Sequence, residues 1–190
     1  MIGEIGYIFL IFAFTLSFLQ FFNSVKISFF SFSEENFKFL KSLSYFISFF
    51  LLFSFFSLII SYVISDFSIL NVYNNSHTNK PLLYKISGTW GNHEGSLLMW
   101  LAMLGLYGLL FTRFITKEST IFTSKALFAI SIINIGFIGF TIFTSNPFER
   151  ISPIPLEGNG LNPVLQDPGL AFHPPLLYLG YAGLTIPFAY

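Results

Sequence analysis

Residues Leu43–Ile64 read LSYFISFFLLFSFFSLIISYVI, and this stretch decides the class of fold. It contains no Asp, Glu, Lys, Arg or His. A membrane-spanning α-helix needs about 20 mostly apolar residues to cross the hydrocarbon core of a bilayer. The stretch is long enough and apolar enough to meet that requirement, so it predicts a transmembrane helix.

The rest of the chain has the same apolar character. Of its 190 residues, 54% are hydrophobic and 9% are charged, whereas soluble domains carry about 25% charged residues. A soluble fold of this length could not bury so much apolar surface. The formal net charge is zero, which argues against nucleic acid as a partner. The absence of cysteine excludes disulfides, a thiol nucleophile and a thiolate metal site.

Three more stretches qualify as full spans, namely Ile5–Phe22, Gly95–Thr112 and Ala126–Ser145. The last apolar run, Pro174–Tyr190, would make about 25 Å of helix, less than the ~30 Å of hydrocarbon to be crossed. The sequence therefore predicts an all-α, polytopic transmembrane helix bundle with four full spans and a partial fifth. We expect residues 1–190 to form a single transmembrane domain, and we interpret the partial fifth span as one that a longer protein would continue.

The distribution of Lys and Arg predicts the orientation, because cytoplasmic or matrix loops carry an excess of these residues. One side of the membrane holds six of them and the other holds three. The side with three is then the outer side, with the N-terminus and the long loops 65–94 and 146–173. The larger set is Lys26, Lys38, Lys41, Arg113, Lys117 and Lys125, and the smaller set is Lys80, Lys85 and Arg150.

One histidine stands at an unusual place, at the start of the fifth apolar run. Residues Leu161–Tyr181 read LNPVLQDPGLAFHPPLLYLGY and place His173 directly before Pro174 and Pro175. Proline disfavours helical geometry in the residue before it and suits the first turn of a helix. We therefore expect His173 at or near the helix N-cap, where the helix dipole favours a neutral imidazole that is able to bind a metal.

A carboxylate lies shortly upstream of this histidine. Asp167 belongs to an Asp-Pro-Gly turn and could orient the imidazole, as carboxylates commonly do for histidines that ligate metals. The alternative is that His173 only caps the helix. The residues alone leave both interpretations open.

A second motif, WGNHEGSLLMW, leads into the third span from Trp90. Glu94 interacts favourably with the dipole at a helix start, and Gly91 and Gly95 permit a tight turn and close packing. His93 and Glu94 do not belong to the HExxH zinc motif, because no second histidine follows. We interpret this segment as a structural turn into the span, with a polar role at the outer surface.

Several segments together resemble a known family. WGNHEGSLLMWLAMLGLYG and LNPVLQDPGLAFHPPLLYLGYAG are similar to the N-terminal part of CcmF, the haem-lyase membrane subunit of the multi-component cytochrome c maturation pathway. GEIGYIFLIFAF, YKISGTWG and NPFER fit as well, so the resemblance covers nearly the whole chain. It implies a cytochrome c assembly factor that binds haem at the outer face and helps to attach it to apocytochrome c.

The resemblance also implies site residues. The family holds incoming haem with a tryptophan-rich outer segment and two outer histidines, the first of which stands in an HPP motif. Here that histidine is His173, the candidate axial ligand of the haem iron and the one candidate metal-binding residue. No catalytic residue is assigned. The candidate supporting residues of the outer-face motifs are Trp90, Gly91, His93, Glu94, Asp167, Pro174 and Pro175.

The sequence departs from the family pattern in three respects. It lacks the tryptophan-rich segment, the second outer histidine and the histidines that ligate a resident haem inside the membrane. We therefore expect a haem site completed by other chains, and an activity that exists only within a haem-lyase complex of the holocytochrome c synthase type. The expected partners are other fragments of a split protein, a haem chaperone, thiol-handling subunits and apocytochrome c.

The 28 phenylalanines indicate an AT-rich genome. We expect an organelle-encoded protein of the mitochondrial inner membrane, with the bacterial inner membrane as the alternative. The alternative to haem handling is a structural subunit that binds no haem and scaffolds a larger respiratory or maturation complex.

Overall fold

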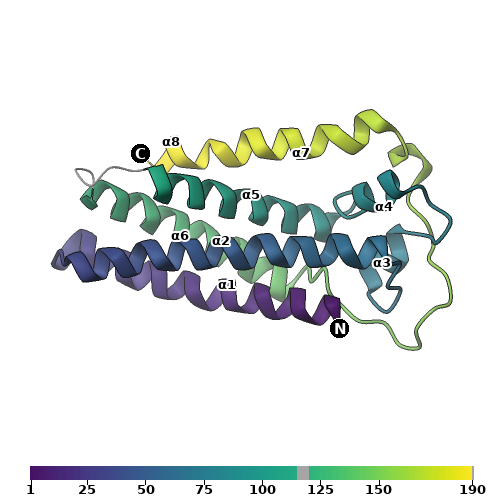
Figure 1. Cartoon of the computed structure of the whole chain (residues 1–190), viewed down its shortest axis with the longest axis horizontal. Helices are drawn as coiled ribbons and strands as arrows, with labels where there is room; N and C mark the ends of the chain where they lie inside the picture. The colour runs from purple at the N-terminus through teal and green to yellow at the C-terminus, as the bar shows by residue number, and fades with distance from the viewer. Residues whose placement is uncertain (115–119, 190) are drawn as a thin grey trace.

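The computed structural model describes residues 1–114 and 120–189, which form a bundle of long helices (Figure 1). In this part of the chain, four helices are long and apolar enough to cross a membrane. The predicted all-α membrane bundle with four full spans is therefore confirmed. These helices are α1 (Ile2–Val25), which a π-helical turn continues over Lys26–Phe30, α2 (Glu34–Val63), α5 (His93–Phe114) and α6 (Thr120–Phe143).

The predicted partial fifth span corresponds to α7 (Pro168–Gly183), which has 16 residues and is followed by α8 (Thr185–Ala189). The predicted start at Pro174 is wrong, because the helix begins at Pro168. The Asp167 side chain accepts a hydrogen bond from the Leu170 amide at 3.2 Å and so acts as the N-cap. Pro168 occupies the first helical position, where a missing amide hydrogen costs nothing.

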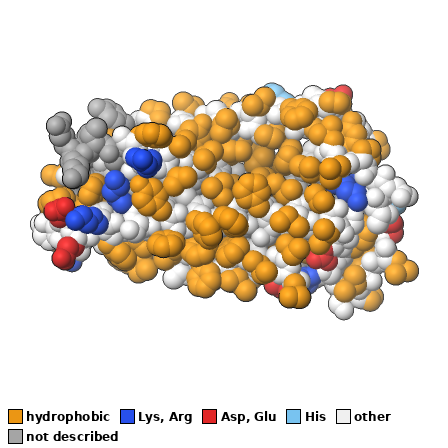
Figure 2. All heavy atoms as spheres, in the orientation of Figure 1, with side chains coloured by type: hydrophobic (Ala, Val, Ile, Leu, Met, Phe, Trp, Pro, Cys, Tyr) orange, Lys and Arg blue, Asp and Glu red, His pale blue; other side chains and the backbone are white. Residues whose placement is uncertain are grey.

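The order of packing places α5 next to α7. α1 packs against α2 and α6, α2 packs against α5, and α5 lies between α6 and α7. Buried leucines such as Leu10, Leu51, Leu58 and Leu98 form the centre of the bundle. Many phenylalanines remain exposed, and Figure 2 shows apolar side chains over most of the visible surface. Such a surface suits contact with lipid.

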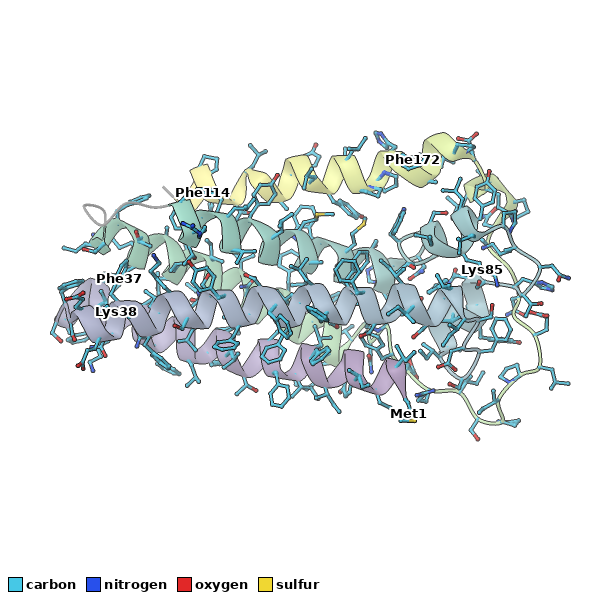
Figure 3. The ribbon with its side chains drawn as sticks, in the orientation of Figure 1. Met1, Phe37, Lys38, Lys85, Phe114 and Phe172 are labelled. Atoms are coloured by element: carbon cyan, nitrogen blue, oxygen red, sulfur yellow. The ribbon has the colours of Figure 1, made fainter. Side chains whose placement is uncertain are left out.

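Charged side chains collect at the two ends of the bundle (Figure 2), where Figure 3 labels Lys38 at one end and Lys85 at the other. The end with Lys85 also holds Met1, and we call it the loop end (Figure 3). Lys117, which was counted for the orientation, lies outside the described residues. The orientation itself stays a prediction.

The two long loops of the loop end are folded together rather than extended. The first contains α3 (Leu70–Asn75) and α4 (Leu82–Gly88), and the second contains a 3-10 turn over Pro163–Leu165. We call residues 64–92 and 144–167 together the loop layer. Its two parts are joined by the backbone hydrogen bonds Leu70 N to Glu149 O, Ile151 N to Ser68 O, Asn159 N to Tyr73 O and Gly160 N to Ser76 O.

Candidate functional site

Asn92 organises the turn that leads into α5. Its amide nitrogen donates hydrogen bonds to the Tyr62 hydroxyl at 3.0 Å and to the Gly88 carbonyl at 2.8 Å. Its amide oxygen accepts from the Gly95 amide at 2.8 Å and from the Asn71 side chain at 2.7 Å. One side chain thus ties α2, α3 and α4 to the start of α5, in agreement with the interpretation of this segment as a structural turn.

Glycine is required at the end of this turn. A Cβ atom on Gly95 would overlap the Thr89 carbonyl oxygen, and one on Gly91 would come within 3.1 Å of Leu161 Cδ1. The backbone of α5 therefore approaches the preceding residues more closely than a side chain would allow. This close approach accounts for the second glycine of the WGNHEG motif.

Trp90 connects this turn to α7. Pro174 and Pro175 lie inside α7, and a proline within a helix cannot donate to the carbonyl four residues earlier. The carbonyls of Leu170 and Ala171 therefore lose their helical partners. The Trp90 indole nitrogen donates to the Ala171 carbonyl oxygen at 3.0 Å and replaces one of the missing bonds.

His173 lies in the second turn of α7, so its predicted position at the N-cap is wrong. A residue before proline normally avoids helical geometry. His173 is helical nevertheless, because Asp167 and Pro168 start the helix upstream of it. The imidazole is exposed and has no hydrogen-bond partner within residues 1–114 and 120–189. Figure 3 labels the preceding residue, Phe172, on α7 near the loop end.

The other polar candidates lie apart from His173. Among the described residues, no hydrogen bond joins Asp167 to His173, and the Asp167 carboxylate caps the helix instead of orienting the imidazole. His93 is exposed at the first position of α5, where its ring meets Phe140 edge-on at 6.3 Å between centroids. Glu94 accepts a hydrogen bond from Asn71 at 3.3 Å and faces a different pocket.

A cavity of about 290 Å³ separates the start of α5 from α7. Trp90, Gly91 and Pro174 line it together with Tyr178 and Ser96. The last two also line an adjoining hollow of about 220 Å³ that reaches Trp100 and Phe137. We call the two hollows together the α5–α7 groove. The sequence motifs meet here, but His93, Glu94, Asp167, His173 and Pro175 are not among the lining residues.

The groove is lined mainly by aromatic and apolar side chains. The Trp100 ring packs edge-on against Tyr178 at 5.4 Å and stacks on Phe137 at 6.2 Å between centroids. Its larger cavity is just below the ~300–1,000 Å³ typical of small-molecule pockets. It can therefore accept one edge of a large flat apolar ligand such as a porphyrin, but not the whole molecule. His173 precedes Pro174 in the chain, but it is exposed and does not line the groove.

The loop layer also contains two perturbed ionisable groups. The Glu157 carboxylate accepts hydrogen bonds from the Thr78 hydroxyl at 2.5 Å, the Thr78 amide at 2.9 Å and the Gly158 amide at 3.0 Å. These bonds, led by the Thr78 hydroxyl, lower the pKa of Glu157 to about 2. Burial, followed by the nearby charge of Lys85, lowers the pKa of Lys80 to about 8.

Three residues of this region were missed by sequence reasoning. Asn92 stands inside the quoted motif, directly before a helix, and its capping chemistry was a usable signal. Tyr62 and Tyr178 carried no such signal. A tyrosine in an apolar helix is equally typical of a residue that anchors the helix at the membrane interface.

The comparisons with known proteins agree with these motifs. The family model described as "Cytochrome C assembly protein" matches residues 90–190, which contain both the WGNHEG turn and the HPP segment. CycK of Bradyrhizobium diazoefficiens, a cytochrome c-type biogenesis protein, is 52% identical over 137 residues, covering 72% of this chain and 21% of that protein. CcmF of Escherichia coli is 42% identical over 138 residues, with the same coverage of 72% and 21%.

A solved structure supports the fold. The chain of "Cytochrome c Heme Lyase CcmF" superimposes with a TM-score of 0.83 at 23% identity, covering 100% of this chain and 29% of that one. The chain spans about a fifth of the length of the curated relatives that it matches, since 21% of each is covered.

The motif that turns into α5 and the proline segment of α7 thus lie in one matched region, and both are built into one helical membrane bundle. The chain belongs to the cytochrome c assembly protein family and is a CcmF-type membrane protein of cytochrome c biogenesis.

Proposed function

We propose that the chain forms the haem-receiving part of a cytochrome c haem lyase, with His173 as one axial ligand to the iron of incoming haem. The observation that carries this proposal is the imidazole of His173, which is exposed and without a partner in the described parts of the chain. The resemblance of the HPP segment to the CcmF family supports the same role. Haem is a substrate in this reaction.

The helix that carries His173 is held in a fixed position. Asp167 caps its start, Trp90 binds the Ala171 carbonyl, and the Tyr107 hydroxyl donates to the Leu179 carbonyl at 2.8 Å. A ligand on a rigid scaffold loses less conformational entropy when it binds. The backbone that carries His173 is therefore held in place, although its imidazole has no hydrogen-bond partner among the described residues.

The α5–α7 groove would contact one edge of the haem ring. Trp90, Pro174 and Tyr178 offer apolar surface on the side of α7 that faces α5. Burying that edge would orient the ring, while iron–imidazole coordination would hold it. Held in this way, haem would present its vinyl groups to the thiols of apocytochrome c. Each S–H adds across one vinyl double bond, so that sulfur bonds to carbon and the proton goes to the other carbon.

This part of the site needs further haem contacts. We propose that they come from segments outside these 190 residues, because the relatives are about five times longer. In a split protein, as predicted, those segments would be separate chains. The haem chaperone, the thiol-handling subunits and apocytochrome c would then meet the loop end.

We propose that the loop end faces the outside of the membrane, which the smaller number of Lys and Arg residues there supports. The matched relatives are bacterial proteins, which favours the bacterial inner membrane. The mitochondrial inner membrane, inferred from the phenylalanine content, stays a prediction.

The test is a haem spectrum of the protein purified together with its natural maturation partners. In the variant His173→Gly we expect loss of the haem absorption that depends on axial histidine, and recovery of that absorption when imidazole is added. His93→Gly is the matched control, because His93 is also exposed at the loop end and does not lie in the HPP segment, so the spectrum should stay unchanged. An unchanged spectrum and an unchanged cytochrome c level in His173→Gly would leave the scaffold role as the better account.

A further inference from the structure

An apolar hollow of about 370 Å³ lies between α5 and α6, beside the α5–α7 groove. We call it the α5–α6 furrow, and its lining residues are Leu97, Ile132, Ile133, Gly136, Phe137 and Phe140. None of these six residues is charged. The furrow shares Leu97 and Phe137 with the hollow around Trp100, so the two hollows adjoin.

Gly136 leaves a gap in the wall of this furrow. It is exposed, and no atom of the described residues lies within 4 Å of a Cβ at its position. It lies seven residues before the end of α6 at Phe143, about 10 Å inside the bundle. The bulky Ile132 and Phe140 stand one helical turn on either side of it. A gap of this shape accepts the side-chain ridge of another helix, and a small residue lets the two backbones approach closely.

Trp100 favours protein over lipid as the occupant. Its ring lines the adjoining hollow, and its buried indole nitrogen has no hydrogen-bond partner in the described part of the chain. An unpaired N–H group is unfavourable in apolar surroundings. A lipid acyl chain carries no acceptor, whereas helices that pack in membranes commonly bring polar side chains that bond across the contact.

The relatives supply a source for such a helix. This chain covers 21% of the curated relatives, and it superimposes in full on only 29% of the solved CcmF chain. A CcmF-type protein therefore has several times more chain to place around this bundle than these 190 residues contain. That remaining chain is the argument for an occupant that belongs to the same type of protein.

A second apolar hollow, between α1 and α6, shows what the furrow has in addition. That hollow measures about 260 Å³ and is lined by Phe18, Phe21, Phe22, Ile132 and Ile135. Its described lining contains no glycine and no polar group, so lipid tails can fill it at no cost. Only the furrow combines an apolar wall with a glycine gap and an adjoining unpaired N–H group, among the described residues.

We propose that the α5–α6 furrow docks one membrane-spanning helix of a separate chain that carries part of the remaining CcmF-type sequence. The contacting face of that helix is apolar and uncharged, it passes closest to α6 at Gly136, and it has a hydrogen-bond acceptor at the level of Trp100. Because the two hollows adjoin, the docked helix would also cover the hollow around Trp100. The proposal rests on the split-protein part of the proposed function and does not depend on haem binding.

The test replaces Phe140 by the photo-cross-linking amino acid p-benzoylphenylalanine in the full chain and irradiates the native membrane. The activated carbonyl inserts into nearby C–H bonds, so it labels lipid and protein alike. We expect a cross-link to a separate chain, with the attached peptide, identified by mass spectrometry, in an apolar stretch of about 20 residues of CcmF-type sequence. Phe56 is the control position, because it is also exposed but lies on α2, outside the furrow, and should label lipid.

Gly136→Leu fills the gap and should reduce the yield of this cross-link about tenfold, because extra atoms are unfavourable in a closely packed contact. The melting temperature of the purified chain should not fall, since a Cβ at Gly136 meets no described atom within 4 Å. Thr15→Leu is the matched control, because Thr15 is an exposed small residue of α1 outside the furrow and should leave the yield unchanged.

Three results would overturn the proposal. The first is lipid as the sole product at Phe140. The second is a cross-linked peptide from another copy of this chain or from a protein without CcmF-type sequence. The third is an unchanged yield in Gly136→Leu. If Gly136→Leu lowers the melting temperature, the identity of the cross-linked peptide alone decides. The cross-link is read without haem, so its absence would leave the role of His173 to the haem spectrum.

Discussion

The indole nitrogen of Trp90 lies 3.0 Å from the carbonyl oxygen of Ala171, which Pro175 leaves without a helical partner. Trp90 opens the WGNHEG motif and Pro175 closes the HPP motif. The two motifs are therefore parts of one interaction. Pro175 leaves the Ala171 carbonyl without a helical donor, and the Trp90 indole in the turn before α5 donates to it instead.

Trp90→Phe should lower the free energy of unfolding by about 1 kcal/mol, the usual net value of one hydrogen bond. Denaturant unfolding in detergent measures the change. The effect should shrink in a Pro175→Ala background, because residue 175 then donates to Ala171 itself. Trp100→Phe is the control, since no described residue accepts a hydrogen bond from the buried Trp100 indole nitrogen. Equal losses for Trp90→Phe in both backgrounds would contradict the account.

Gly95→Ala should destabilise the turn into α5 by about 1–3 kcal/mol or prevent folding, as overpacking commonly does. Its Cβ would overlap the Thr89 carbonyl oxygen, which backbone packing holds in place. Gly136→Ala in α6 is the matched control, because no atom lies within 4 Å of a Cβ at that position. Thermal melting of the two variants measures the difference, and equal melting temperatures would contradict the close approach.

The free energy of unfolding should increase with pH between about 8 and 10.5, because Lys80 loses its proton in the folded state first. The pKa of Lys80 is lowered from 10.5 to about 8 in the folded state, first by burial and then by Lys85. In that interval the unfolded chain binds more protons than the folded one, so unfolding becomes less favourable as pH increases. Unfolding curves at several pH values measure the slope. Lys80→Met should remove this rise, and a slope unchanged in that variant would exclude Lys80 as its source.

Glu157 should also make the free energy of unfolding increase with pH, but in the acidic range. Its pKa is lowered from 4.5 to about 2, mainly by the Thr78 hydroxyl. Its contribution to stability is complete above pH 4.5 and disappears as pH falls through 2. Thr78→Val should therefore destabilise the loop layer at pH 7. It should also reduce the loss of stability between pH 4.5 and pH 2. Hydrogen exchange of Asn159 and Gly160, whose amides bind Tyr73 and Ser76, reports the change; unchanged protection would argue against it.

The spans could be predicted from the sequence because each is a long apolar run, a property of local composition alone. The start of α7 was placed at Pro174 by mistake, although Asp167 before Pro168 is a readable start signal. A side-chain cap together with proline at the first position outweighs the bias against helix before a later proline.

The site was only partly predictable for a different reason. Gly91, Gly95 and Glu94 were assigned to a turn from their local chemistry, and that turn is present. The bond from Trp90 to Ala171 joins residues 81 positions apart, and no local pattern specifies it.

The same separation of 81 residues sets an order of events during synthesis. Chains grow at about 5–20 residues per second, so Trp90 is made roughly 4–16 s before Ala171 exists to receive its hydrogen bond. During that interval α5 and α6 are made while the turn before α5 still lacks its bond to α7. The nascent protein therefore passes through a stage in which the four spans exist but α7 does not yet line the groove.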